Sequence, residues 1–284
     1  MGAIFRHELR NYFHSLTAYV FGAFLLAVVG LGSVLYNLQA AVSNFEFVLS
    51  FASIIFVVIV PILTMRTLAE ERRQRTDQPL PITTTQVVLG KYFALLVVYL
   101  IPLAVVSLYP LLFSQFGEVY LPTSYGSLFA FFMMGAALLA VGMFLSSLTD
   151  NQGFAAGIGI AAILLNYYSV SLAEYTSSTA MGSLIALYVI ALLLGVVIHN
   201  LTRNENLAYG VTLVLIAALS VAYFVNSSAF EGLLPDIMTK LSLFRQFNSF
   251  VNGAFDLTAI VYYVSVMGFF LFLSVQSMEK RRYN

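Results

Sequence analysis

Cysteine is absent from the 284-residue sequence, and charged residues make up only 9% of it. The lack of cysteine excludes disulfide bonds and thiolate chemistry. An ordinary soluble domain carries about 25% charged residues, so the charge content is unusually low. Because 60% of the residues are hydrophobic, a soluble fold cannot hide enough apolar surface, and lipid must solvate much of the chain. The formal net charge is zero, which argues against nucleic acid as a partner.

Patterns for a nucleotide, metal or ion-coupling site are also missing. The glycine-rich stretch 153–159 lies in an apolar run and lacks the lysine and serine or threonine of a phosphate-binding loop. Three histidines, His7, His14 and His199, are too scattered for a metal site. No acidic residue falls within the predicted spans, where ion pumps and proton-coupled carriers usually have one. We therefore expect no catalytic, cofactor-binding or metal-binding residues, and expect a partner to supply any energy.

Eight charge-free apolar runs are long enough to cross a bilayer as helices, since a spanning helix needs about 20 residues. Barrel strands are about ten residues long and alternate in polarity, which these runs do not. The sequence therefore predicts an all-α, polytopic membrane helical bundle that forms a single transmembrane domain over residues 1–284. The predicted spans are residues 18–38, 47–65, 92–113, 127–148, 153–172, 181–198, 207–225 and 257–275. The sixth and seventh form a predicted tight hairpin over 181–225.

Lysine and arginine residues predict the orientation. If the N-terminus is cytoplasmic, eight spans place 11 of the 13 positively charged residues inside, and only Lys240 and Arg245 outside. Cytoplasmic loops carry an excess of these residues in membrane proteins. The distribution thus favours a multi-pass plasma-membrane protein with both termini cytoplasmic, including the basic tail 276–284.

The first 17 residues predict an amphipathic helix in the cytoplasmic membrane interface. An ordinary juxtamembrane anchor is the alternative interpretation of the same pattern. One helical face carries Ile4, Phe5, Leu9, Tyr12, Phe13 and Leu16, and the other carries Arg6, His7, Arg10, Asn11 and His14.

The cytoplasmic loop 66–91 is the longest and most charged on its side. Its first part extends the second span as a helix, and the prolines within 78–81 must break that helix. Thr83 followed by Gln86 fits a capping box, which restarts a helix into the third span. A helix, a rigid turn and a second helix provide a docking surface for a cytoplasmic partner. The alternative is a solvated charge run that only fixes topology.

Two other segments lie between spans. The tight cytoplasmic link 149–152 contains Asp150, which either contacts a partner or caps the next helix. The external stretch 226–256 is rich in leucine and phenylalanine but interrupted by charge. It predicts one or two short helices that lie on or dip into the outer leaflet before the last span.

Several short motifs, in a fixed order relative to the spans, carry a family resemblance over most of the first 110 and the last 40 residues. They are FRHELRNYF at 5–13, AYVF at 18–21, VPILTMR at 60–66, AEE at 69–71, VVLGKY at 87–92, FNSFVNGAFD at 247–256 and VYY at 261–263. The pattern resembles the permease subunits of type-2 ABC exporters. Within these it is similar to the branch of the gliding-motility and copper-site-assembly (nitrous oxide reductase maturation) permeases.

The resemblance implies a non-catalytic permease subunit of an ATP-driven exporter in the bacterial inner membrane, with ATP and Mg²⁺ bound by a separate cytoplasmic ATPase. The amphipathic start would be the elbow helix, the loop 66–91 the main coupling element, and the segment 226–256 the external re-entrant helices. The family core commonly has six spans, so 181–198 and 207–225 would be the additional pair. The expected ATPase-coupling residues are Arg66, Glu70, Glu71, Arg72, Arg73 and Asp150.

The resemblance also implies an assembly of two permease subunits, identical or related, with two ABC ATPase subunits. The second and fifth spans would line the interface between the permeases. Asn166, Tyr167 and Tyr168 are candidates for this interface or a substrate path, because polar groups in a span prefer protein or water to lipid. A mechanotransmission subunit that acts on an accessory subunit with a large external domain is the alternative. A membrane-embedded enzyme lacks the polar constellation it would need within the spans.

Overall fold

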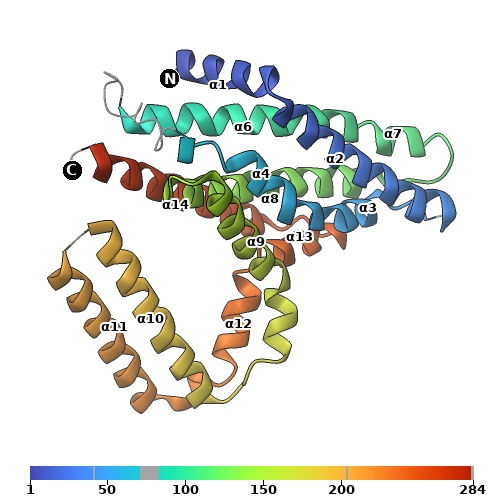
Figure 1. The fold of residues 1–284 in the computed structure, drawn as a ribbon. Coiled ribbons are helices and arrows are strands. Elements are labelled where there is room, and N and C mark those ends of the chain that lie inside the picture. Colours follow the sequence, from blue (N-terminus) through green and yellow to red (C-terminus); the bar gives the residue numbers. More distant parts are fainter. Residues whose placement is uncertain (41, 71–82, 203, 283–284) are drawn as a thin grey trace. The chain divides into compact units, whose positions relative to one another are not determined.

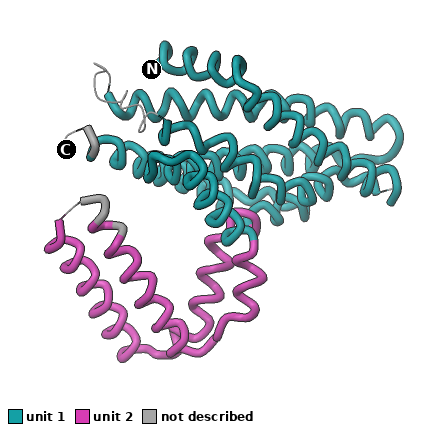
Figure 2. The backbone as a smooth tube through the Cα atoms, in the orientation of Figure 1, with its two compact units in different colours: residues 1–167, 246–282 teal, residues 168–245, 283–284 magenta. Residues whose placement is uncertain are grey.

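The computed structural model describes residues 1–40, 42–70, 83–202 and 204–282. Every regular element within these residues is a helix (Figure 1), which confirms the all-α prediction. The described chain divides into two compact units (Figure 2). Unit 1 comprises residues 1–167 and 246–282, and unit 2 comprises residues 168–245. The predicted hairpin 181–225 falls wholly within unit 2.

Seven helical segments of the described chain are long and apolar enough to cross a membrane, which confirms a polytopic helical bundle. They are Leu16–Gln39, Phe45–Thr64, Thr84–Phe113, Leu121–Ser147, Gln152–Glu174, Glu205–Val225 and Leu257–Lys280. The remaining predicted span, 181–198, corresponds to α10 (Ala180–Thr202). The apolar segment Ala180–Val196 of α10 is shorter than these seven, so a count of eight spans stays a prediction.

Unit 1 contains most of the predicted spans. Its first elements are α1 (Gly2–His14), α2 (Leu16–Gly32), the π-helical turn η1 (Ser33–Gln39), α3 (Phe45–Ala52), the 3-10 turn η2 (Ser53–Ile55) and α4 (Phe56–Thr64). It continues with α6 (Thr84–Val106), α7 (Tyr109–Phe113), α8 (Leu121–Ser147), residues 152–167 of α9 (Gln152–Glu174), residues 246–251 of α13 (Leu243–Val251), and α14 (Leu257–Arg282).

Helix α8 is the central helix of unit 1, and most of its residues are buried. Two tyrosines of α6 bind its backbone: the Tyr92 hydroxyl donates to Ala136 O at 2.9 Å, and the Tyr99 hydroxyl donates to Phe131 O at 2.8 Å. Glycine is required at position 135, because a Cβ there would lie 2.6 Å from the Tyr99 ring. Hydroxyl groups without partners are costly in a dry interior, so these bonds fix α6 on α8.

The end of α13 also packs on α8 within unit 1. Phe247 and Phe250 are buried, and the Phe247 ring lies 5.8 Å from that of Phe131. The Ser127 hydroxyl donates to Phe250 O at 2.9 Å. The segment just before the last span is therefore anchored in the core of this unit.

Unit 2 is built around α10 and α11 (Glu205–Val225), which pack side by side. The hydroxyls of Tyr188 and Ser220 lie 2.7 Å apart, and Gly195 faces Thr212. The earlier residue of α10, Tyr188, contacts the later residue of α11, Ser220, and the later residue Gly195 contacts the earlier residue Thr212. The two helices are therefore antiparallel. The short helices η3 (Ser227–Phe230) and α12 (Leu233–Lys240) follow.

Candidate coupling site

The predicted coupling loop begins after α4, and the structure describes it as far as Glu70. Ser146 of α8 holds this loop stem, which we define as residues 65–70. Its hydroxyl donates to Met65 O at 3.1 Å and accepts from the amides of Leu68 at 3.3 Å and Ala69 at 3.1 Å. Leu68 and Ala69 are buried. The loop stem is therefore fixed to the central helix of unit 1.

Of the residues expected to couple to an ATPase, the structure places Arg66 and Glu70 in the loop stem. Arg66 is exposed and Glu70 is half-buried. The amide of Glu70 donates to the carbonyl of Arg66 at 3.4 Å, so the two lie within one turn of each other. Glu71, Arg72 and Arg73 lie outside the described residues.

A cluster of polar side chains joins the loop stem to α1 and α6. We call Glu8, Tyr12, Thr67, Glu70 and Lys91 the buried polar cluster. Lys91 Nζ lies 2.8 Å from Glu8 Oε1, and the two side chains are only 5% and 16% exposed. Tyr12 is hydrogen-bonded to Thr67, and it lies within electrostatic range of the three charged members.

The protonation state of Tyr12 follows from its burial. Burial raises the pKa of the Tyr12 phenol to about 12, the negative charges of Glu8 and Glu70 add to this, and Thr67 and Lys91 act in the opposite direction. The ordinary tyrosine pKa already lies above neutral pH, and this shift moves it further away, so the phenol is a neutral hydrogen-bonding group. Sequence reasoning missed this cluster, apart from Glu70, because its members come from three distant segments.

Helix α1 lies alongside the beginning of α6 (Figure 1). Glycine at position 90 allows this close approach, since a Cβ there would lie 3.1 Å from Ile4 Cγ2. The ion pair between Glu8 of α1 and Lys91 of α6 also joins these two helices. The amphipathic helix, the loop stem and the start of α6 are thus fixed to one another within unit 1.

Asp150 lies at the same end of α8 as the loop stem, four residues after Ser146. It is exposed. Asn151 provides the helix cap that one interpretation of the sequence assigned to Asp150: its Oδ1 accepts from the amides of Gly153 at 2.9 Å and Phe154 at 3.2 Å. The exposed carboxylate of Asp150 therefore lies next to a capped, well-defined turn.

Asn166, Tyr167 and Tyr168 are not brought to this site. They lie on α9, where a rise of 1.5 Å per residue puts Asn166 about 21 Å from Gln152. Asn166 and Tyr167 are half-buried in unit 1, whereas Tyr168 is 46% exposed and belongs to unit 2.

Glu46 corrects the expectation that the spans hold no acidic residue. The second span begins at Phe45, two residues before its predicted start, so Glu46 lies in the first helical turn and is 3% exposed. Its carboxylate accepts from Asn44 Nδ2 at 2.7 Å and Ser124 Oγ at 3.2 Å. An acidic residue is stabilised at a helix N-terminus, which is the local pattern that could have predicted it. The part of the chain that the structure describes contains no group of three or more His, Cys, Asp or Glu residues able to hold a metal ion.

Comparison with known proteins identifies a family. The family model of the ABC-2 family transporter proteins matches residues 30–173, just over half of the chain. The matched region contains the loop stem, Ser146, Asp150 and Lys91. Comparison with curated proteins and with solved structures gave no match.

Proposed function

Because the chain belongs to the ABC-2 transporter family, we propose that it is the membrane permease of an exporter driven by a separate cytoplasmic ATPase. The observation that carries the coupling proposal is the loop stem, which Ser146 fastens to the central helix of unit 1. An ATPase can move membrane helices only through an element that touches both partners. The segment 66–81 fits this role, and ATP and Mg²⁺ would be bound by the ATPase subunits rather than by this chain.

The contacts of the loop stem suggest how motion would be transmitted. A displacement of the stem would act on α8 through Ser146 and on α1 through the Tyr12–Thr67 contact. The same end of α8 also contacts α14, since the Ser277 hydroxyl donates to Ser147 O at 3.2 Å. Charged residues at the beginning of the loop, Arg66 and Glu70 with the neighbouring 71–73, would pair with the ATPase, and Asp150 would provide a second contact.

We further propose that the exporter contains two permeases and two ATPases. Most residues of α9 are half-buried or exposed, so this helix has surface available for lipid or a second subunit. Gly157 and Ala161 are both exposed and four residues apart, a spacing that permits close approach of membrane helices. This supports the fifth span, with Asn166, Tyr167 and Tyr168, as part of the permease interface. The second span would complete that interface.

The orientation and the branch within the family are part of the same proposal. We propose that both termini are cytoplasmic and that the membrane is a bacterial inner membrane. The excess of lysine and arginine on the predicted inner side supports this orientation. The ordered motifs point to the branch of the gliding-motility and copper-site-assembly permeases. Within that branch, action on an accessory subunit with a large external domain stays the alternative to solute transport.

The composition of the complex tests the proposal. The chain is to be purified from its native membrane together with the ATPase that co-elutes with it, and the mass of the intact complex measured. We expect two permeases with two ATPases, and no ATP binding or hydrolysis by the permease purified alone, because it has no phosphate-binding loop. A complex with one permease, or specific nucleotide binding by the isolated chain free of contaminating ATPase, would contradict the proposal.

A further inference from the structure

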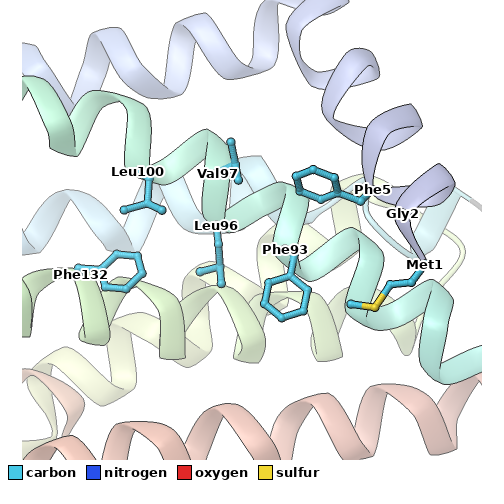
Figure 3. A pocket seen from close by; sticks show the side chains of 8 residues that line it. All are labelled: Met1, Gly2, Phe5, Phe93, Leu96, Val97, Leu100 and Phe132. Atoms are coloured by element: carbon cyan, nitrogen blue, oxygen red, sulfur yellow. The ribbon is translucent and has the colours of Figure 1, made fainter.

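An apolar pocket with a volume of about 490 Å³ lies between α1, α6 and α8 in unit 1 (Figure 3). The volume is within the range of about 300–1,000 Å³ that is typical of ligand sites. Every residue that lines it is apolar. Its walls include Gly2 and Phe5 of α1, Phe93, Leu96 and Leu100 of α6, and Phe132 of α8.

The position of the pocket indicates which kind of ligand can reach it. Helix α6 is part of a predicted membrane span, and Phe93 and Leu100 are 43% and 42% exposed. Their surroundings are therefore the bilayer. Helix α1 is amphipathic and is predicted to lie in the membrane interface. An apolar pocket between an interfacial helix and a spanning helix lies where acyl chains meet their headgroups.

The positively charged residues of α1 indicate which kind of lipid headgroup the pocket would bind. Gly2, Arg6, Arg10 and His14 are spaced four residues apart, so they form one row along the helix. The row begins with Gly2 at the pocket, and Arg6 follows one turn later with its side chain exposed. Arg10 donates from Nε to His14 Nε2 at 3.2 Å, which continues the row. The acidic residue of this helix, Glu8, is paired with Lys91.

We propose that the pocket binds one acyl chain of an anionic phospholipid, with the lipid phosphate held by Arg6 and Arg10. The apolar walls take the chain, and the basic row complements the negative headgroup. Anionic lipids give the cytoplasmic leaflet its negative surface potential, so this leaflet supplies the lipid, a step that rests on the proposed orientation. The bound lipid fills a space between α1 and α6, the two helices that the Glu8–Lys91 ion pair joins. The lipid would thereby stabilise the packing of α1 on α6.

Photolabelling of the purified full-length chain tests the pocket. The chain is reconstituted without ATPase in phosphatidylcholine vesicles that contain a trace of phosphatidylglycerol with a photoreactive acyl chain. Labelled peptides should come from α1 and from the part of α6 that contains residues 93–100. Leu96→Trp fills the pocket and should abolish this labelling. Ile101→Trp is the matched control, because Ile101 is exposed on the same helix but does not line the pocket; it should leave the labelling unchanged.

The headgroup is tested in the same vesicles. Arg6→Gln should lower phosphatidylglycerol labelling about fivefold, on the order of the attraction between one basic residue and anionic lipid. Arg245→Gln, a surface arginine of unit 2, should have no effect. Equal labelling by photoreactive phosphatidylcholine, or equal loss in the Leu96 and Ile101 variants, would overturn the proposal. Cross-links from the pocket to a second copy of the chain would overturn it as well. Because no ATPase is present, failure here is distinct from failure of the proposed function.

Discussion

Replacement of Lys91 by methionine is expected to lower the free energy of unfolding by about 3–5 kcal/mol, the cost of removing one partner of a buried ion pair. Methionine preserves the length and apolar character of the side chain. The loss would come from Glu8, whose carboxylate lies 2.8 Å from Lys91 Nζ and is only 16% exposed. The measurement is equilibrium unfolding of the purified chain in detergent micelles.

A second variant separates the charge effect from a packing effect. Glu8→Leu combined with Lys91→Met removes both charges, and replacing a buried pair by apolar residues is often neutral or stabilising. We therefore expect the double variant to recover most of the lost stability. Lys240→Met is the matched control, since Lys240 pairs with Asp236 at 2.7 Å in an exposed position, and exposed pairs contribute only about 0–1 kcal/mol. Equal losses for Lys91→Met and Lys240→Met would contradict a structural role for the buried polar cluster.

Reversal of the charges at Glu70 and Glu71 is expected to weaken ATPase association by at least about tenfold, since a buried interfacial charge that loses its partner costs about 2–5 kcal/mol. Glu70 lies at the end of the loop stem, where the chain leaves the support of Ser146. A positive charge there would face the partner group that the carboxylate had matched. Membrane insertion should be unaffected, because acidic residues contribute little to orientation.

The matched control for this reversal is Glu205→Arg with Glu279→Arg. Both residues are predicted to be cytoplasmic and lie outside the coupling site, and the pair of substitutions changes the net charge by the same amount. If the control variant lost ATPase association to the same degree, the effect would be one of net charge and not of the coupling loop.

The helical bundle could be predicted from the sequence because its evidence is local. Long apolar runs without charge define spans wherever they occur, and the segment of α1 shows its amphipathic pattern within 13 residues. The start of the second span was misplaced by two residues, which hid Glu46. A helix boundary depends on a few residues, and here Asn44 and the distant Ser124 satisfy the buried carboxylate.

The candidate coupling site could be predicted only in part. The loop was evident from its charge and prolines, and Arg66 and Glu70 lie in the loop stem, the part of it that the structure describes. The side chains that hold it could not be found in the same way. Ser146 is about 80 residues from the amides that it binds, and Lys91 is 83 residues from Glu8. Contacts between distant segments leave no periodic pattern in the sequence. These side chains could therefore be identified only from the folded structure.

Co-purification of the ATPase with the Glu70→Arg, Glu71→Arg permease, together with its permease-stimulated ATP hydrolysis, tests most directly whether the loop after α4 couples this chain to its motor. We expect the variant to reach the membrane at the normal level, but to retain little ATPase or to leave hydrolysis unstimulated, while the Glu205→Arg, Glu279→Arg control behaves as the unmodified chain. Normal co-purification and normal stimulation of the Glu70→Arg, Glu71→Arg variant at equal expression would show that this loop is not the coupling element.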